Sequence, residues 1–218
     1  MFASLINMSA DFPTQTINCF GEDITLPVLA DAKRNQRLRE TLENGQWEPD
    51  TFQAIDRFVD SETDYIDIGA WIGATVFYGA KKARRVFAVE PDPVSVSRLE
   101  ALIPKNEGDI TLIPRALTDQ KAVQLRPKKA FGESSSSVLH ASSGQSVEVP
   151  GITLRNILDQ TDRPVFIKVD IEGLEYYLEK VLFDIDPNRI KGMQIAVHPH
   201  LYGRSLTNRF FRKRWETY

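Results

Sequence analysis

The stretch DYIDIGAWIGATVFYGAKKARRVFAVEP, residues 64–91, predicts the fold of this chain. Its first apolar run, 65–68, is long enough for a buried strand and too short for a helix. A glycine turn at 69–73 follows, and then a helical segment rich in alanine and aromatic residues. A second apolar run, 86–89, ends at Glu90. The order strand, glycine turn, helix, strand and acid is typical of half of a nucleotide-binding α/β unit.

The turn indicates which kind of nucleotide to expect. It lacks the G-x-G-x-x-G pattern of dinucleotide sites, and Asp67 stands just before its first glycine, Gly69. A carboxylate there would repel a pyrophosphate. It suits S-adenosylmethionine, which carries an ammonium, a sulfonium and a ribose, and Glu90 is placed to accept hydrogen bonds from the ribose hydroxyls. Gly69 permits backbone angles that other residues avoid, and Gly73 permits close approach of helix and ligand. The alternative is a tight strand-to-helix turn in an α/β domain of another kind.

The composition excludes several classes of protein. A chain of 218 residues, 42% of them hydrophobic, can form one α/β domain with a sizeable core. The net charge of −3 gives no electrostatic case for a nucleic-acid partner. The single cysteine, Cys19, excludes an internal disulfide and a cysteine-based zinc site. No apolar run could span a membrane, and residues 1–10 lack the features of a signal peptide, so we expect a cytoplasmic protein.

Residues 1–60 are expected to form a flank or lid packed on a core of residues 61–218, within a single globular unit. The flank should contain two short strands within 17–29, a helix over 31–43 and a second helix capped by Asp50. Further strands are predicted at 110–113, 122–125, 165–169 and 193–197, with a helix from Pro93 to Ile103 and a helix capped by Thr153.

Alternating strands and helices predict a mostly parallel sheet, and such sheets bind ligands at the carboxyl ends of their strands. One edge of this sheet should therefore carry five polar side chains: Asp67, Glu90, Arg115, Asp170 and His198. Arg115 and Ala116 follow the third strand and are expected to border an adenine ring. The serine-rich segment 131–145 is either a flexible linker or a binding loop.

With these residues located, the chain resembles the FkbM family of class I methyltransferases. The resemblance rests on six motifs in a fitting order and spacing: DIGAWIGATVFYGA at 67–80, VFAVEPDP at 86–93, ALTD at 116–119, ESSSSV at 133–138, IKVDIEGLE at 167–175 and AVHP at 196–199. It implies a Rossmann-like sheet and methylation that depends on S-adenosylmethionine, usually at a hydroxyl oxygen.

The resemblance also implies roles for individual residues. The methionine end of the cofactor is assigned to Asp67, Gly69, Ala70 and Gly73, and the ribose to Glu90. Trp71 occupies the position of the glycine turn that is most often asparagine in the family, and it places a bulky ring beside the cofactor. Glu48, in a Trp-Glu element, resembles a residue that closes over the cofactor.

The family sheet also has a strand pair after the fifth strand. Here only residues 199–218 follow His198, and they are typical of a helix. We therefore expect a sheet trimmed at this end or a chain that is cut short.

Transfer to a hydroxyl needs alignment and a general base, because an alcohol is a weak nucleophile at neutral pH. His198 is the first candidate for that base, since histidine titrates near physiological pH, and a strand-end histidine bonded to backbone is the alternative. Asp170 is the second, as base, orienting group or metal ligand. A divalent cation held by Asp170, Glu172, His198 and His200 is a less favoured alternative, because no tight ligand spacing demands it.

The predicted function is S-adenosylmethionine-dependent O-methylation of a sugar or a small molecule resembling a natural product. Two other classes remain open. One is a methyltransferase fold without catalytic activity that serves as an interaction module, and the other is a nucleotide-binding oxidoreductase. The acceptor is open among the hydroxyls of sugars, lipids, polyketides and peptides.

Overall fold

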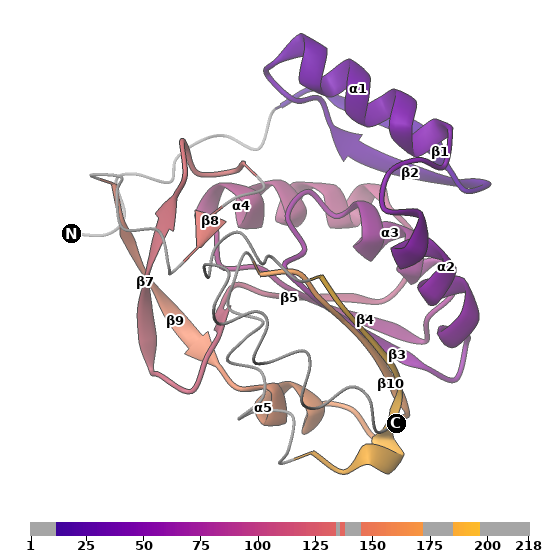
Figure 1. Ribbon diagram of the computed structural model, residues 1–218, viewed down its shortest axis with the longest axis vertical. Helices are drawn as coiled ribbons and strands as arrows, with labels where there is room; N and C mark the ends of the chain where they lie inside the picture. Colours follow the sequence, from indigo (N-terminus) through magenta and orange to yellow (C-terminus); the bar gives the residue numbers. More distant parts are fainter. Residues whose placement is uncertain (1–11, 134–135, 138–144, 172–184, 197–218) are drawn as a thin grey trace, which may run out of the picture.

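The computed structural model describes residues 12–133, 136–137, 145–171 and 185–196 (Figure 1). The flank begins with a hairpin and two helices: β1 (Thr14–Cys19), β2 (Glu22–Pro27), α1 (Ala32–Glu43) and α2 (Pro49–Phe58). The chain then alternates between strands and helices: β3 (Asp64–Ile68), α3 (Ala74–Ala80), β4 (Arg85–Val89), α4 (Pro93–Leu102), the 3₁₀ turn η1 (Ile103–Lys105) and β5 (Ile110–Ile113). The later described elements are β6 (Ala116–Leu117), β7 (Ala122–Pro127), β8 (Ser136–Ser137), β9 (Val147–Ile152), α5 (Leu154–Leu158), β10 (Val165–Val169), the 3₁₀ turn η3 (Pro187–Arg189) and β11 (Ile190–Ile195).

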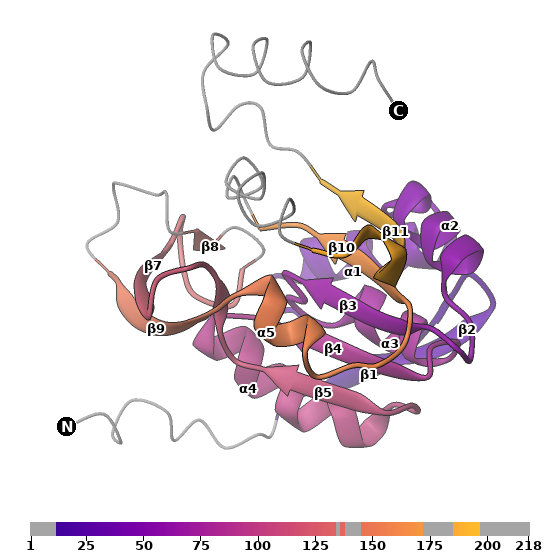
Figure 2. The same cartoon turned by 90° about the horizontal axis from the view of Figure 1, so that it is seen from below.

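The central sheet is parallel, as expected, and its described strands lie in the order β11-β10-β3-β4-β5 (Figure 2). The chain starts the sheet with β3, adds β4 and β5 on one side, and then returns to add β10 and β11 on the other. The strand order therefore reverses between β3 and β10, where ligands bind in folds of this kind. Asp67 of β3 is paired in register with Lys168 of β10, so the ends of these two strands lie side by side.

Helices cover both faces of this sheet (Figures 1 and 2). Tyr65 and Phe166 point to the face covered by α2, α3 and α4, where the hairpin and α1 also pack. Ile66 and Ile167, the next residues along each strand, join the other core with α5. Every residue of β3 and β10 is buried, which explains why most residues of both strands are apolar, with Asp64, Asp67 and Lys168 as the buried charged ones.

The sequence predicted two helix caps, Thr153 and Asp50. Thr153 caps α5 as predicted, and α1 is capped by Asp31, which was predicted to lie inside that helix. The prediction for Asp50 was wrong, because α2 already begins at Pro49 and Asp50 lies inside its first turn. Proline favours the first position of a helix, and it moves the cap position back to Glu48.

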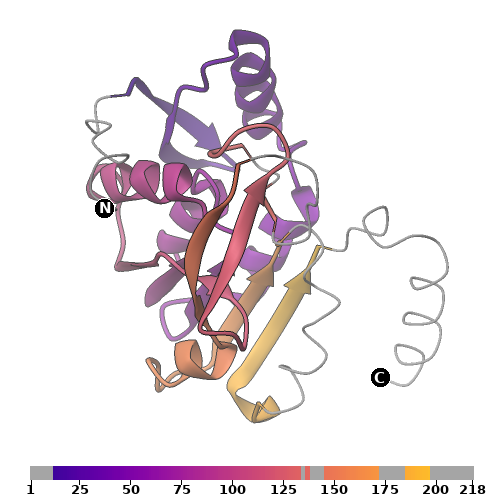
Figure 3. The ribbon, with the colours of Figure 1, turned by 90° about the vertical axis from the view of Figure 1, so that its left-hand side faces the viewer.

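A second, smaller sheet was only partly predicted. Its strands lie in the order β6-β9-β7-β8, and β9 runs antiparallel to β7 (Figure 3). The sequence predicted β7 but not β6, β8 or β9. The fifth strand of the central sheet, β11, begins three residues earlier than the predicted 193–197. Residues 199–218, which were predicted to form a helix where the family sheet has a further strand pair, lie outside the described residues.

Candidate functional site

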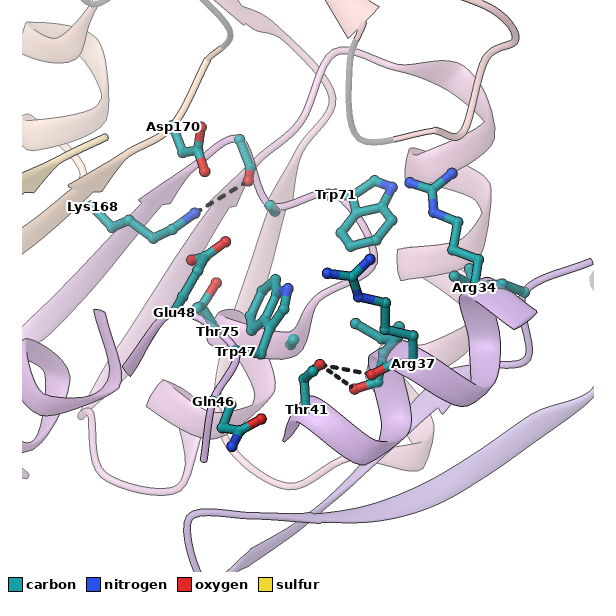
Figure 4. A pocket seen from close by; sticks show the side chains of 15 residues that line it. Arg34, Arg37, Thr41, Gln46, Trp47, Glu48, Trp71, Thr75, Lys168 and Asp170 are labelled. Atoms are coloured by element: carbon teal, nitrogen blue, oxygen red, sulfur yellow. Dashed lines mark hydrogen bonds between the residues drawn. The ribbon is translucent and has the colours of Figure 1, made fainter. Parts of the chain in front are cut away.

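A cavity of about 490 Å³ lies at the reversal of strand order (Figure 4). Four segments line it: the inner side of α1, residues 46–48, the glycine turn at 69–71 with the start of α3, and the end of β10. Figure 4 shows the carboxylates of Glu48 and Asp170 near the ammonium of Lys168, with the indoles of Trp47 and Trp71 farther along the cavity. The flank and the core thus each supply part of the wall.

Glu48 reaches the cavity from an unusual backbone conformation. Its φ of 44° and ψ of 51° are left-handed, at the N-cap position of α2, and its side chain makes no capping bond there. A non-glycine residue in this region costs about 1–3 kcal/mol, and such strain is concentrated at functional sites. The hydroxyl of Thr51 donates to a carboxylate oxygen of Glu48 at 3.3 Å. Burial raises the pKa of Glu48, and the positive charge of Lys168 opposes that shift.

Lys168 is a cavity residue that sequence reasoning missed. It stands in the apolar run of β10, only 4% exposed. Its ammonium donates to Asp67 Oδ1 at 3.3 Å and to the carbonyl oxygen of Gly69 at 3.5 Å. Burial alone would lower the pKa of Lys168, but the carboxylates of Asp67, Asp170 and Glu48 outweigh it and raise the pKa. The feature of the sequence that could have indicated its role is a lysine within the apolar run 165–169, which is typical of a strand buried on both faces.

Asp67 is buried behind the cavity wall and is not among the residues that line the cavity. Its Oδ2 accepts hydrogen bonds from the hydroxyls of Tyr65 at 2.8 Å and Thr75 at 2.5 Å, while Oδ1 faces Lys168. This carboxylate is therefore occupied by the protein itself. It fixes the lysine and the start of α3 relative to the glycine turn.

Gly69 is confined by the end of β10. Its φ is +89°, and a Cβ at this position would collide with the backbone carbonyl oxygen of Asp170 and lie 2.9 Å from the carbonyl carbon. The backbone N–H of Asp170 donates to Ile68 at 2.9 Å, which holds the two strand ends together. Gly69 and Asp170 are thus positioned by each other, and both line the cavity.

Glu90 follows β4 and is buried, outside the lining of the cavity. Its two carboxylate oxygens accept hydrogen bonds from the backbone N–H groups of Trp71 and Asp92, each at 2.8 Å. Burial raises its pKa to about 7, although both N–H donors favour the ionised form. Glu90 is thus linked to the glycine turn through Trp71, which has a left-handed φ of 47°.

Residues 131–133, the start of the serine-rich segment, lie against this same region. The indole N–H of Trp71 donates to the carbonyl of Gly132 at 3.2 Å, and Arg98 donates to it at 2.7 Å. The N–H of Gly132 in turn contacts both carboxylate oxygens of Asp92, at 2.9 and 2.8 Å. The beginning of the segment is therefore anchored beside the glycine turn, while 134–135 and 138–144 lie outside the described residues.

The other predicted site residues are more dispersed. Ala70 lines the cavity, but Gly73 starts α3, and a Cβ there would meet the rings of Phe77 and the side chain of Leu99. Its role in the structure is thus close packing within the fold. Arg115 is exposed and donates to Gly151 at 3.2 Å, and Ala116 is buried in β6; neither lines the cavity.

Part of the predicted chemistry lies beyond what the structure describes. His198, Glu172 and His200 fall in 172–184 and 197–218, so neither the histidine base nor the alternative metal set can be placed. Within the described ranges, no group of three or more histidine, cysteine, aspartate or glutamate side chains could hold a metal ion. In the same ranges, no helix is both long enough and apolar enough to cross a membrane.

The comparisons with known proteins identify the family. The model of the methyltransferase FkbM domain matches residues 67–206, which begin at the buried aspartate of β3 and include the glycine turn, Glu90, Lys168 and Asp170. Among curated proteins, none matches the chain. Because the family model covers more than half of the sequence and its match begins within the strand that leads into the cavity, this chain belongs to the FkbM methyltransferase family.

Proposed function

We propose that the protein is an S-adenosylmethionine-dependent methyltransferase that methylates a hydroxyl oxygen of a sugar or a small molecule resembling a natural product. The observation that carries the proposal is the pair of carboxylates, Glu48 and Asp170, on a cavity at the strand-order reversal of a methyltransferase-family domain. A ligand seated there meets negative charge beside the glycine turn. That favours a cationic ligand over one that carries a pyrophosphate.

The residues present fit this cofactor. Glu48 and Asp170 would hold its ammonium and sulfonium end, because both carboxylates line the cavity beside the glycine turn. Glu90 would hold the ribose, since within the described ranges each of its oxygens accepts one backbone hydrogen bond and a carboxylate oxygen can accept two. Asp67 would act indirectly, by positioning Lys168 and Thr75.

S-Adenosylmethionine, when bound, supplies a methyl group activated by the sulfonium. The protein then has to align an acceptor hydroxyl with that methyl group and remove its proton. Asp170 is our candidate among the described residues to orient or deprotonate the hydroxyl, because it lines the cavity beside Gly69. His198 remains the proposed alternative base. Trp47 and Trp71 would exclude water from the reacting atoms.

We further propose that residues 1–60 act as a flank that completes the site on the core of 61–218. The flank supplies α1, Trp47 and Glu48 to the cavity wall. Trp47 is tied to α1 by a hydrogen bond from its backbone N–H to the carbonyl of Thr41 at 3.0 Å, and its indole packs edge-on against Phe52 of α2. A ligand between flank and core would therefore contact both.

Glu90 gives this proposal a pH-dependent test. The ionised carboxylate is the better acceptor for ribose hydroxyls, and the pKa of about 7 means that it is protonated in much of the free protein at lower pH. Since apparent affinity scales with the ionised fraction, S-adenosylhomocysteine should bind roughly 25-fold more weakly at about pH 5.5 than at about pH 7.5. Titration calorimetry at both pH values measures this.

The variant Glu90→Gln should bind S-adenosylhomocysteine about 10- to 150-fold more weakly at about pH 7.5. This factor corresponds to the free energy that hydrogen bonds to a charged group contribute to binding. Its affinity should also change little with pH, because glutamine does not titrate. Glu100→Gln, on the exposed side of α4, is the matched control and should behave like wild type. Wild-type binding that is independent of pH, together with unchanged affinity in Glu90→Gln, would remove Glu90 from the ribose site.

A further inference from the structure

The wall of the cavity opposite Glu48 and Asp170 is basic. Arg34 and Arg37 are one helical turn apart on α1, and both line the cavity. Figure 4 shows the guanidinium of Arg37 directed into the cavity between the indoles of Trp47 and Trp71, and that of Arg34 beside Trp71. The cavity is thus bipolar, with the carboxylates of Glu48 and Asp170 at one side and the guanidinium groups of α1 at the other.

The two arginines differ in what they already contact. Arg34 lies over the ring of Trp71, 5.5 Å from its centre, and 3.6 Å from Glu133, in an ion pair whose two side chains are 39% and 35% exposed. Such exposed pairs are weak. Across the described part of the chain, the guanidinium of Arg37 has no hydrogen bond and no ion pair. The hydrogen bond from the hydroxyl of Thr41 is accepted by the backbone carbonyl of Arg37 and not by its side chain. Arg37 is therefore available to an anion in the cavity.

Trp47 lies next to this charge. Gln46 and Trp47 both donate their backbone N–H to the carbonyl of Thr41, at 2.7 and 3.0 Å, which ties the backbone of Trp47 to α1. The indole is half-buried and packs edge-on against Phe52, with ring centres 5.9 Å apart. A fixed aromatic face beside a guanidinium suits a ring-shaped ligand that carries an acidic group.

We propose that Arg37, with Arg34 beside it, binds an oxyanion on the methyl acceptor, so that the acceptor is an acidic sugar whose ring packs on Trp47. This inference rests on the proposed function. Repulsion from Glu48 and Asp170 and attraction to the arginines would hold the acidic group of the acceptor at α1. That orientation directs its hydroxyls toward the glycine turn and Asp170, where the methyl group is transferred.

The carboxylate of the cofactor is the competing occupant of this basic wall. The position of the arginines in the chain favours the acceptor. The family match begins at residue 67 and includes the glycine turn, Glu90 and Asp170, whereas α1 and Trp47 lie before it. Glu48 also lies before the match, but it is the flank residue beside Lys168 and Asp170, where the cationic end of the cofactor is proposed. Arg34 and Arg37 lie away from that end, beside the two indoles, where contacts that select an acceptor are expected.

The test is a calorimetric titration of the protein saturated with S-adenosylhomocysteine. The probes are glucose, glucuronic acid and glucose 6-phosphate. We expect at least one acidic sugar to bind ten times or more tighter than glucose, and the better of the two identifies carboxylate or phosphate as the group recognised. Arg37→Gln should remove this preference and leave the affinity for glucose and for S-adenosylhomocysteine within twofold. Arg39→Gln is the matched control, since Arg39 lies on the same helix, outside the cavity, and pairs with Glu43.

Other outcomes overturn the inference in distinguishable ways. If neither acidic sugar binds better than glucose, or if none of the three binds, the acceptor is not an acidic sugar. If Arg37→Gln instead weakens S-adenosylhomocysteine, the arginine holds the carboxylate of the cofactor and the proposed function stands. If S-adenosylhomocysteine binds neither the wild type nor Arg37→Gln, the proposed function itself fails.

Discussion

Replacing Gly69 by alanine should destabilise the protein by about 3 kcal/mol or more and abolish binding of S-adenosylhomocysteine. Two effects add at this position. The backbone φ of +89° is unfavourable for any side chain, and the new Cβ would collide with the carbonyl of Asp170. The end of β10 would have to move, and Asp170 would leave its place on the cavity. Urea denaturation gives the free energy of unfolding, and calorimetry gives the loss of binding.

Gly21 provides a control for the backbone effect. Its φ of +91° is nearly the same, but a Cβ there would meet nothing within 4 Å. Gly21→Ala should therefore cost only the roughly 1 kcal/mol of a left-handed alanine, and it should leave binding unchanged. Equal losses of stability in the two variants would mean that the contact between Gly69 and Asp170 is unimportant. A Gly69→Ala protein that binds normally would contradict the site.

The largest electrostatic effect is expected for the pair of Asp67 and Lys168. Asp67→Asn leaves the ammonium of a nearly fully buried lysine without its closest counter-charge, and it should cost about 3–5 kcal/mol. Lys168→Met keeps the length of the side chain but leaves the buried carboxylate without the lysine. The double variant should lose much less than the sum of the two, with a coupling energy of at least about 1 kcal/mol. Urea denaturation of the four proteins measures it.

Arg39 and Glu43 on α1 provide the control cycle. Their side chains are 55% and 36% exposed and 2.8 Å apart, so the same double-mutant cycle should give about 0.5 kcal/mol or less. If the losses at Asp67 and Lys168 simply add, the two charges do not depend on each other. Lys168 would then have to be stabilised chiefly by Glu48 and Asp170, which also favour its charged form.

The central sheet could be predicted because its strands are buried on both faces. Apolar runs such as 65–68 and 165–169 have few alternatives, and the glycines and acids that end them mark the ligand edge. The small sheet was harder to predict. β9 has one buried residue, Val149, and includes Pro150 and Gly151, so its pattern is weak.

The site was only partly predictable for a different reason. That Asp67 holds the methionine end stays a prediction, and its carboxylate has protein partners that the sequence did not indicate: Tyr65, Thr75 and Lys168. The lysine stands in the other half of the sequence, and its contact with Asp67 exists only because β3 and β10 are paired in register. Arg37 could not be recognised from the sequence either, because a charged residue on a helix usually faces solvent. Only the fold shows that a cavity lies beside this one.

The titration of wild-type protein with S-adenosylhomocysteine and, separately, with NADH tests the account most directly. We predict that S-adenosylhomocysteine binds in the low-micromolar to sub-millimolar range, about 5–8 kcal/mol, as expected for a reusable cofactor. NADH should give no measurable heat, because its pyrophosphate would face Glu48 and Asp170. Binding of NADH without S-adenosylhomocysteine would contradict the account in favour of an oxidoreductase. Binding of neither would contradict it in favour of a methyltransferase fold that serves as an interaction module.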